Sequence, residues 1–293
     1  MPANSITIFG EALFDCFPDG SRILGGAPFN VAWHLQGLGA EPLFVSRIGR
    51  DAAGAELLEA MQNHGMRQNG MEIDAARPTG SVAVSIDNGQ PSYHILEEQA
   101  YDYIAAPELP IGHESGLLYH GSLALRHSVS RATFEQIKRQ WRGPVFFDVN
   151  LRAPWWNADD IQKWIDGADW LKLNDEELAL LLPDGHTIDS KLRLLQQRYD
   201  LRGVVVTRGE HGALALSDSG EFVEVKPASS VVVLDTVGAG DAFAAVLLLG
   251  IDRGWPLAPT LARAQDFASV IVGQRGATVS DPEFYRRFRE AWH

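Results

Sequence analysis

Apolar runs rich in β-branched residues alternate with amphipathic stretches along most of the chain. After Pro110 the order is regular, because each apolar run is followed by a stretch with apolar residues at helical spacing. The predicted strands cover residues 116–119, 144–148, 170–173 and 203–207, and the predicted helices cover 131–140, 159–166, 175–182 and 191–199. An antiparallel pair is predicted at 213–216 and 222–225, followed by helices of which 257–272 is the longest. Strands this apolar are usually covered on both faces, which indicates an α/β fold with a doubly wound, mostly parallel sheet.

The N-terminal part begins with the same rhythm and then changes. Strands are predicted at 6–9 and 43–46, and helices at 31–38 and 51–64. Residues 81–86 and 92–95 then alternate between apolar and polar around a turn at 87–89, which predicts a hairpin with one apolar face. We expect a single domain spanning residues 1–293, with a small β lid formed by about 12–24 and 70–103.

The stretch 234–243 is the most distinctive part of the sequence. An apolar run, 231–233, precedes it and good helix formers follow it, so it is predicted to be a strand-to-helix turn. The Gly-Ala-Gly at 238–240 has little bulk, and the amides at a helix start bind anions. The carboxylate of Asp241 would repel such an anion, which makes sense if it takes a proton from a hydroxyl that attacks a bound phosphate. The alternative is an ordinary helix start capped by Asp241.

Polar residues that follow two other predicted strands have a structural and a functional interpretation. Asn174 begins a helix and Glu177 lies three residues on, which is close to a capping box. The same pair could instead hold waters around a phosphate-bound Mg²⁺, which keeps several waters and takes few direct ligands. Arg152 either clamps phosphate oxygens or forms a surface salt bridge.

Two glycine-containing loops are further candidates for ligand contacts. The loop 207–212 is interpreted either as a nucleotide-contact surface at a strand end or as a hairpin turn. The loop 25–30, together with Asp15, either binds sugar hydroxyls, with glycines that allow close approach, or is an ordinary loop and helix cap.

Composition and missing motifs narrow the function class. The 293-residue chain has a formal net charge of −13, which disfavours nucleic acid and anionic membranes as partners. With one cysteine, Cys16, and no signal-peptide pattern, we expect a cytoplasmic protein. The longest apolar run, 242–249, is too short to span a membrane. The histidines do not have the spacing of a metal site. The sequence also lacks a Walker motif, a G-x-S-x-G motif and an early G-x-G-x-x-G motif. These absences argue against P-loop chemistry, serine-hydrolase chemistry and dinucleotide-dependent oxidoreductase chemistry, respectively.

Taken in chain order, these segments resemble the ribokinase/PfkB family of carbohydrate kinases, from Gly10 to about Ser280. The resemblance rests on Gly-Gly-Ala-Pro-Phe-Asn-Val-Ala at 25–32 and on Asp-Thr-Val-Gly-Ala-Gly-Asp-Ala-Phe at 235–243, the second being highly specific to the family. Three shorter matches lie between them, at 148–152, 172–177 and 207–212. The resemblance implies a ribokinase-like fold and ATP-dependent phosphorylation of a sugar hydroxyl.

The resemblance also implies roles for individual residues. Asp241 would be the catalytic base, and the amides of Gly238, Ala239 and Gly240 would form the anion hole for the transferred phosphoryl group. Arg152 would contact the phosphates.

The remaining implied contacts fall into four sets. Mg²⁺ would be organised, through water, by Asn174 and Glu177. ATP would be bound by Asn174, Thr207, Gly209, Gly212, Gly240 and Gln265. The sugar would be held, under a lid that excludes water, by Asp15, Gly25, Gly26, Asn30 and Asp241. A monovalent cation such as K⁺, which many relatives bind, would lie at Asp235, Val237, Ile271, Gln274, Gly276 and Ser280.

The substrate is predicted from the branch of the family. Residues 25–28 and 148–152 look most like fructokinases, which implies D-fructose phosphorylated at its terminal primary hydroxyl. Ribokinases have Gly-Gly-Lys-Gly-Ala-Asn at the first site and a sugar-contacting glutamate where this chain has 121–125, so ribose fits less well. Another hexose, a nucleoside or 2-keto-3-deoxygluconate stays open as the substrate. The carboxylate of a sugar acid would need a cation in the lid, and the only candidate in the hairpin 81–95 is His94, when it is protonated.

Two broader questions stay open at the level of sequence. A non-catalytic sugar or nucleotide sensor on the same scaffold is an alternative, against which Asp241 argues. The apolar face of the lid needs cover, either from its own domain or from the lid of a second subunit. The resemblance favours a homodimer formed through the lid, although some relatives are monomers.

Overall fold

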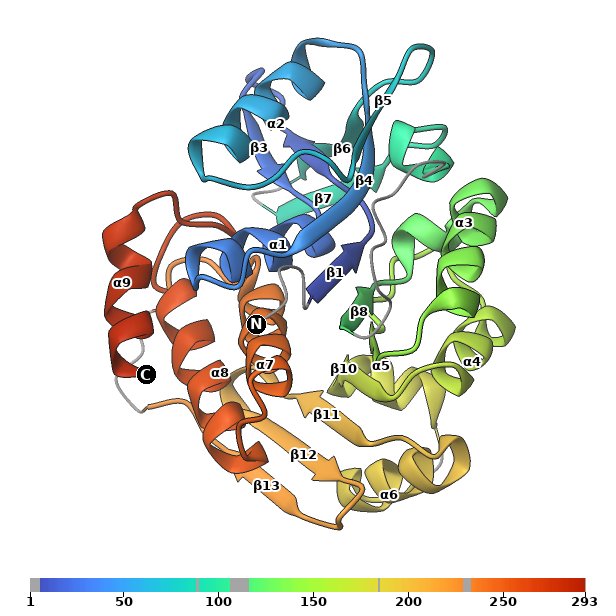
Figure 1. Cartoon of the computed structure of the whole chain (residues 1–293), viewed down its shortest axis with the longest axis vertical. Helices are drawn as coiled ribbons and strands as arrows, with labels where there is room; N and C mark the ends of the chain where they lie inside the picture. The colour runs from blue at the N-terminus through green and yellow to red at the C-terminus, as the bar shows by residue number, and fades with distance from the viewer. Residues whose placement is uncertain (1–5, 88–89, 106–115, 184, 229–232, 293) are drawn as a thin grey trace. The chain divides into compact units, whose positions relative to one another are not determined.

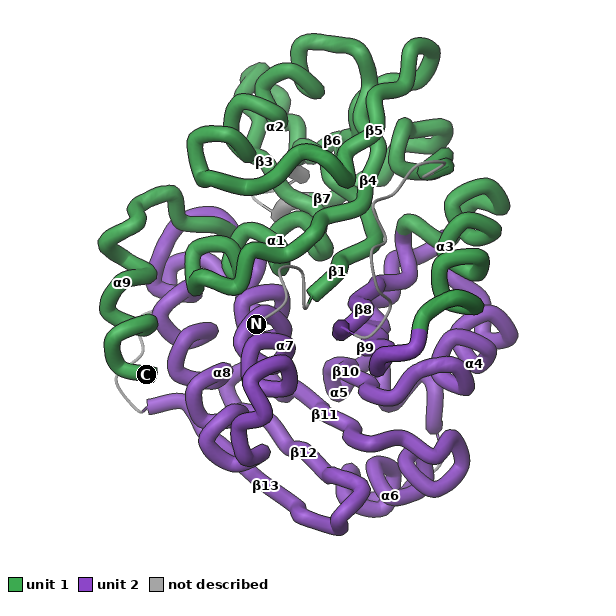
Figure 2. The backbone as a smooth tube through the Cα atoms, viewed as in Figure 1, with its two compact units in different colours: residues 1–114, 124–141, 278–293 green, residues 115–123, 142–277 purple. Residues whose placement is uncertain are grey.

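The chain forms two compact units (Figures 1 and 2). Unit 1 comprises residues 1–114, 124–141 and 278–293, and unit 2 comprises 115–123 and 142–277. This computed structural model describes residues 6–87, 90–105, 116–183, 185–228 and 233–292. The residues expected to form one domain are therefore described below as two units, each with its own strands and helices.

Unit 1 contains a parallel three-stranded sheet with the order β1-β4-β5. Its strands are β1 (Ile6–Phe9), β4 (Leu43–Gly49) and β5 (Met71–Asp74). Its helices are α1 (Ala27–Gly37), α2 (Ala52–Asn63), α3 (Ser128–Gln140) and α9 (Pro282–Ala291), with the 3₁₀ turn η1 at Ala100–Tyr103. The 3₁₀ turn η2 (Leu123–Arg126) begins at the last residue of the first unit 2 segment.

A second, four-stranded sheet in unit 1 is the predicted lid. Its order is β3-β2-β6-β7, formed by β2 (Leu13–Cys16), β3 (Arg22–Gly25), β6 (Gly80–Asp87) and β7 (Gln90–Ile95). The antiparallel pairing of β6 with β7 confirms the predicted hairpin. Of the predicted turn at 87–89, Asp87 is the last residue of β6, and residues 88–89 lie outside the described residues.

The predicted lid start at residue 70 is wrong for its first strand. Residues 71–74 form β5, which pairs in parallel with β4 of the three-stranded sheet, Ser46 being opposite Met71. A short strand with alternating polarity fits either sheet, so periodicity alone does not assign it.

Unit 2 contains a six-stranded sheet with the order β13-β12-β11-β10-β9-β8. Its strands are β8 (Leu117–His120), β9 (Val145–Asp148), β10 (Trp170–Asn174), β11 (Gly203–Thr207), β12 (Ala213–Ser217) and β13 (Phe222–Val225). The first four run parallel and the last two antiparallel, as the sequence predicts. The predicted strand at 231–233 lies mostly outside the described residues.

Five helices cover this sheet (Figure 1). They are α4 (Ala158–Asp166), α5 (Asp175–Leu181), α6 (Ile188–Tyr199), α7 (Ala239–Asp252) and α8 (Leu257–Ile271), with a 3₁₀ turn η3 at Gly209–His211. Every residue of β9 and the first four of β11 are buried, as expected for strands covered on both faces. Within the described ranges, no helix combines the length and apolar character needed to cross a membrane.

Candidate active site

The start of α7 forms the open turn that the sequence predicts. Gly238 is its N-cap residue, with φ at 79° in the left-handed region, and no side chain of the described residues caps the helix. The Ala239 amide donates a long hydrogen bond of 3.4 Å to the Thr236 carbonyl, and Gly240 is exposed. Asp241 lies in the first turn, three residues after the cap, so the alternative in which Asp241 caps the helix is wrong. An uncapped helix start suits an anion such as a phosphoryl group.

This turn is fixed against the segment that follows α8. A methyl group on Gly238 would come within 2.4 Å of the Ala277 Cβ, and the positive φ also disfavours other residues there. Asp235 accepts hydrogen bonds from the Val237 amide on Oδ1 and from the Gly276 amide on Oδ2, both at 3.0 Å. Three of the predicted cation positions are therefore held together.

The other predicted cation positions are divided between the units. Ile271 and Gln274 lie in the same segment of unit 2, and the Gln274 amide donates to the Ile271 carbonyl at 2.9 Å. Ser280 belongs to unit 1. In the part of the chain that the structure describes, no group of three His, Cys, Asp or Glu side chains is arranged to hold a metal ion. The resemblance implies that several of the cation contacts are made through backbone oxygens, which are not among these side-chain groups.

Asn174 and Glu177 form the predicted capping box at the start of α5. The Glu177 amide donates to Asn174 Oδ1 at 2.7 Å, and the Asn174 amide donates to Glu177 Oε2 at 2.8 Å. Glu177 Oε1 also accepts from the Leu151 amide at 2.7 Å, which fixes the loop after β9. Burial is the main cause that raises the pKa of Glu177, and the nearby charge of Asp148 raises it further. The charge of Lys172 and the two backbone N–H donors act in the opposite direction and lower this pKa. A buried carboxylate that follows a strand end is a group that can hold a cation through water.

A buried polar row crosses three strands on one face of the unit 2 sheet. The Lys172 ammonium on β10 lies 2.9 Å from both carboxylate oxygens of Asp148, its register partner on β9. The Tyr119 hydroxyl on β8 donates to Asp148 Oδ2 at 3.3 Å. These three side chains are nearly inaccessible to solvent.

The predicted nucleotide loop lies beside Asn174, because Thr207 is its register partner at the end of the adjacent parallel strand. The Arg208 amide donates to the Gly212 carbonyl at 2.7 Å, so the hairpin-turn interpretation is confirmed. Gly212 has φ at 82°, and a methyl group there would meet the Val225 carbonyl oxygen at 1.9 Å. Gly209, with φ at 52°, stands in open space. Backbone geometry and packing thus explain why residue 212 is a glycine. Gly209 is exposed, so its backbone is accessible to a ligand.

Another predicted nucleotide contact, Gln265, lies on α8, outside the loop 207–212. Gln265 is buried on α8 and donates from Nε2 to the Ser269 hydroxyl at 3.1 Å.

Four of the five predicted sugar contacts lie in unit 1, and the fifth, Asp241, belongs to unit 2. Gly26 is the N-cap residue of α1 with φ at 103°, and its carbonyl accepts from the Asn30 amide at 2.9 Å. A methyl group on Gly25 would lie 3.5 Å from Asp15 Oδ2, and one on Gly26 would clash with the Glu11 carbonyl oxygen at 2.7 Å. Asp15 and Asn30 are therefore placed at the junction of the lid strands with α1.

Comparison with known proteins gives the family. Residues 17–283 match the model of the pfkB family of carbohydrate kinases. The chain belongs to this family. A fructokinase from Klebsiella pneumoniae is 35% identical over 300 residues, which cover 95% of this chain and 96% of that protein.

Two solved structures of pfkB kinases have the same fold. One is the aminoimidazole riboside kinase from Salmonella enterica complexed with aminoimidazole riboside and an ATP analogue, with a TM-score of 0.83, 27% identity and coverage of 97% of this chain and 99% of that one. The other is a fructokinase double mutant from Vibrio cholerae O395 with fructose, ADP and potassium bound, with a TM-score of 0.81, 25% identity and 95% coverage of each chain. The predicted ribokinase-like fold and kinase activity are thus confirmed, and the protein is an ATP-dependent carbohydrate kinase.

Arg152, which was predicted to contact phosphates, is exposed in this pfkB kinase. Its Nη1 donates to the Leu151 carbonyl of its own loop at 3.2 Å. No ion pair of Arg152 occurs among the residues that the structure describes, so the salt-bridge interpretation finds no support.

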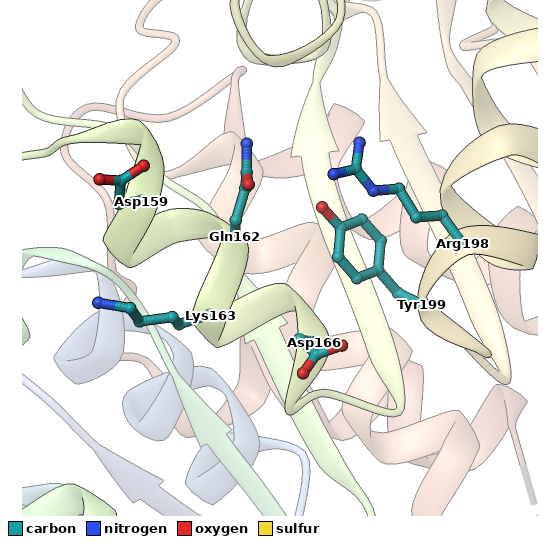
Figure 3. Close-up of a pocket in the computed structure, with 6 residues that line it drawn as sticks. All are labelled: Asp159, Gln162, Lys163, Asp166, Arg198 and Tyr199. Atoms are coloured by element: carbon teal, nitrogen blue, oxygen red, sulfur yellow. The ribbon is translucent and has the colours of Figure 1, made fainter.

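The hollow drawn in Figure 3 is separate from the predicted site residues. It has a volume of about 380 Å³ and lies between α4 and the end of α6. Its lining consists of Asp159, Gln162, Lys163, Asp166, Arg198 and Tyr199. Both signs of charge are mixed there, so it does not have the character of a phosphate site.

Sequence reasoning assigns no individual role to the three residues of the buried polar row, Lys172, Asp148 and Tyr119. Two of them, Lys172 and Asp148, lie in segments that match the family. A signal was present, because a lysine inside an otherwise apolar strand needs a partner when it is buried. The identity of that partner depends on which strands are neighbours, which the local pattern does not contain.

Proposed function

We propose that this pfkB kinase is a fructokinase, which transfers the γ-phosphoryl group of ATP to the terminal primary hydroxyl of D-fructose. The observation that carries the proposal is the uncapped start of α7, where exposed Gly240 is followed by Asp241 in the first helical turn. The 35% identity with a fructokinase over nearly the whole chain supports the choice of sugar.

The reaction uses the start of α7 in two ways. Asp241 accepts the proton of the sugar hydroxyl as its oxygen attacks the γ-phosphorus, and the bond from that phosphorus to the β,γ-bridging oxygen breaks to release ADP. The amides of residues 238–240 stabilise the charge on the phosphoryl oxygens during transfer. Arg152 contacts the phosphates, once its side chain turns from its own loop.

The cofactors assigned here are Mg²⁺ and K⁺. Mg²⁺, held through water by Asn174 and Glu177, would offset the charge of the ATP phosphates. K⁺, at the backbone oxygens near Val237, Ile271 and Gly276, would order the turn that bears the amides. Asp235 supports this second role, because both of its oxygens already tie the two segments together.

Unit 1 supplies the sugar contacts and the lid. Asp15 and Asn30 have the hydrogen-bonding groups that sugar hydroxyls need, and Gly25 lies close to the Asp15 carboxylate. We also propose that the lid mediates a homodimer, because the lid strands carry exposed apolar residues, Ile23 and Tyr93. The single cysteine and the net charge of −13 suit a cytoplasmic enzyme without nucleic-acid or membrane partners.

A second candidate is a kinase for a riboside. It is favoured by the TM-score of 0.83 with the aminoimidazole riboside kinase, which matches that with the fructokinase structure. An ADP-release assay over D-fructose, D-glucose, D-ribose, 2-keto-3-deoxygluconate and aminoimidazole riboside separates the two. The highest kcat/KM is expected for D-fructose, and a higher value for a riboside would replace the proposal.

The variant that tests the mechanism is Asp241→Asn. Loss of the base should lower kcat with D-fructose by at least about 100-fold, because general-base catalysis contributes 10²–10⁴-fold. ADP binding, measured by isothermal titration calorimetry, should be unchanged, since the carboxylate does not hold the nucleotide. Near-normal turnover in this variant would contradict the mechanism, and no turnover by the unmodified enzyme with any acceptor would favour a sensor.

A further inference from the structure

Lys172 lies where a lysine is unexpected. It occupies the middle of β10, between β9 and β11, and its side chain is 7% exposed. Burying an ammonium group costs free energy unless a partner of opposite charge and hydrogen bonds compensate. Asp148 and, behind it, the Tyr119 hydroxyl provide that compensation. The fold therefore holds a fixed positive charge inside unit 2, and the groups next to that charge indicate its function.

The ammonium of Lys172 stands next to the start of α7. A methyl group placed on Gly240 would lie 3.8 Å from the Lys172 Nζ, the nearest heavy atom apart from its chain neighbours and the backbone of its own helix. Gly240 is itself exposed, so the buried ammonium is separated from the proposed phosphoryl position by a residue without a side chain.

The backbone does not explain why residue 240 is a glycine. Its φ lies outside the positive range, unlike that of Gly238, and a methyl group there would make only an ordinary contact. Alanine would also favour the helix. What glycine preserves at this position is an unshielded path from the ammonium to the amides at the helix start.

We propose that Lys172 is a further functional residue of this kinase, whose charge, fixed by Asp148, stabilises the phosphoryl group in transit at the start of α7. This rests on the proposed role of that turn as the anion hole. Lys172 transfers no proton and forms no bond, because Asp148 already occupies two of its three N–H directions. A fixed charge in a nearly dry environment acts on the transition state more strongly than one in water.

Lys172→Met is the first test. The kcat with D-fructose should fall by about 100-fold, the size typical of losing one charge-stabilising group, while the KM for D-fructose changes less than about 3-fold. Lys172→Arg keeps the charge and should recover at least about 10-fold of that loss, since the effect depends on charge.

The matched control is Lys191→Met, which removes the other buried lysine of unit 2. As whole residues, Lys191 is 8% exposed and Lys172 is 5% exposed. The Lys191 ammonium donates to the Leu182 carbonyl, which follows the last residue of α5, whereas the predicted site residues lie at the start of that helix. Its kcat should stay within about 3-fold of the unmodified enzyme, because surface and remote substitutions leave transition-state contacts unchanged.

A second variant separates charge from folding, since Lys172→Met alone leaves Asp148 buried without its partner. The double variant Asp148→Asn with Lys172→Met has no unpaired buried charge, so its melting temperature should return toward that of the unmodified protein. Its kcat should stay low. A folded double variant with kcat within about 3-fold of the unmodified enzyme would overturn the inference.

A binding measurement distinguishes failure of this inference from failure of the proposed function. ADP and Mg²⁺ with aluminium fluoride mimic the phosphoryl group in transit and need no acceptor turnover. By calorimetry, Lys172→Met should lose most of the tightening that aluminium fluoride adds, while ADP alone binds as before. Equal tightening in both proteins would overturn the role of Lys172, whereas turnover of no sugar by the unmodified enzyme would overturn only the fructokinase assignment.

Discussion

At the scale of single residues, Gly238 shows a strict requirement for glycine at the start of α7. It combines a φ of 79° with a methyl-to-Ala277 distance of 2.4 Å, so both its backbone and its surroundings select glycine. Gly254 has a similar φ of 65° but nothing within 4 Å. The pair separates the backbone requirement from the packing requirement.

Gly238→Ala should destabilise the protein by about 3 kcal/mol, the sum of backbone strain and overpacking. It should also lower kcat at least about 10-fold, because the clash with Ala277 displaces the amides that we propose stabilise the transferred group. Gly254→Ala should cost only about 1 kcal/mol and leave kcat unchanged. Urea unfolding and the ADP-release assay measure both, and equal losses in the two variants would show that packing against Ala277 is unimportant.

At the scale of elements, helix ends and their contacts decide much of the arrangement within each unit. In unit 1, His64 ends α2, and its ring stacks on Trp33 of α1 with centroids 3.8 Å apart. Its Nε2–H donates to the Trp33 carbonyl at 3.0 Å. Tyr285 of α9 packs edge-on against the same imidazole, so one neutral histidine joins three helices.

Burial lowers the pKa of His64, which has a consequence for stability. The unfolded chain binds a proton at this residue near its ordinary pKa of about 6.5, whereas the folded protein does so only at lower pH. The free energy of unfolding should therefore be fully supported above about 6.5 and decrease as the pH falls toward the lowered pKa.

His64→Phe keeps a ring in the stack and removes the titration, so its melting temperature should fall less between pH 7.5 and 5.5 than that of the unmodified protein. His186→Gln, at an exposed loop position, is the control and should follow the unmodified protein. Parallel pH profiles for His64→Phe and the unmodified protein would contradict the assignment of this pH dependence to His64.

The element scale is also where prediction from sequence succeeds and fails. The strands and helices of unit 2 are predicted because long apolar runs alternate with helical patterns, and the α5 capping box is predicted from Asn174 and Glu177 three residues apart. The assignment of 71–74 to the lid fails, because strand pairing is a non-local property. The Lys172 contact with the start of α7 is missed for the same reason, since nearly seventy residues of chain separate the two.

At the scale of the whole molecule, the charge of the protein opposes that of its nucleotide. Acidic residues outnumber Lys and Arg by 38 to 25, so the chain repels the anion ATP at long range. Attraction has to come from the groups proposed to contact the phosphates, such as the helix start and the charge of Arg152. Salt weakens the long-range repulsion more than the short-range attraction, because the screening length falls from about 30 Å at 0.01 M to about 8 Å at 0.15 M.

Raising the ionic strength with choline chloride over that range should therefore lower the KM for ATP about 2-fold. The same ionic strength reached with KCl should in addition raise kcat, if K⁺ binds beside Asp235 as proposed. Steady-state kinetics in the two salts measure both effects. A KM that rises with choline chloride would mean that site charges control the approach of ATP, and identical kcat in the two salts would remove the K⁺ proposal.

At residue 240, a substitution that stabilises α7 is expected to lower the rate of the reaction. The backbone at this residue would accept alanine, a methyl group would fit, and alanine at the start of α7 would gain a few tenths to about 1 kcal/mol of stability. A thermostability screen that scored only folding would therefore select alanine there. If the proposed anion site is correct, the resulting protein would be more stable but would carry a methyl group between the Lys172 ammonium and that site. Engineering of this enzyme for heat resistance has to be coupled to a turnover assay at this one position above all others in α7.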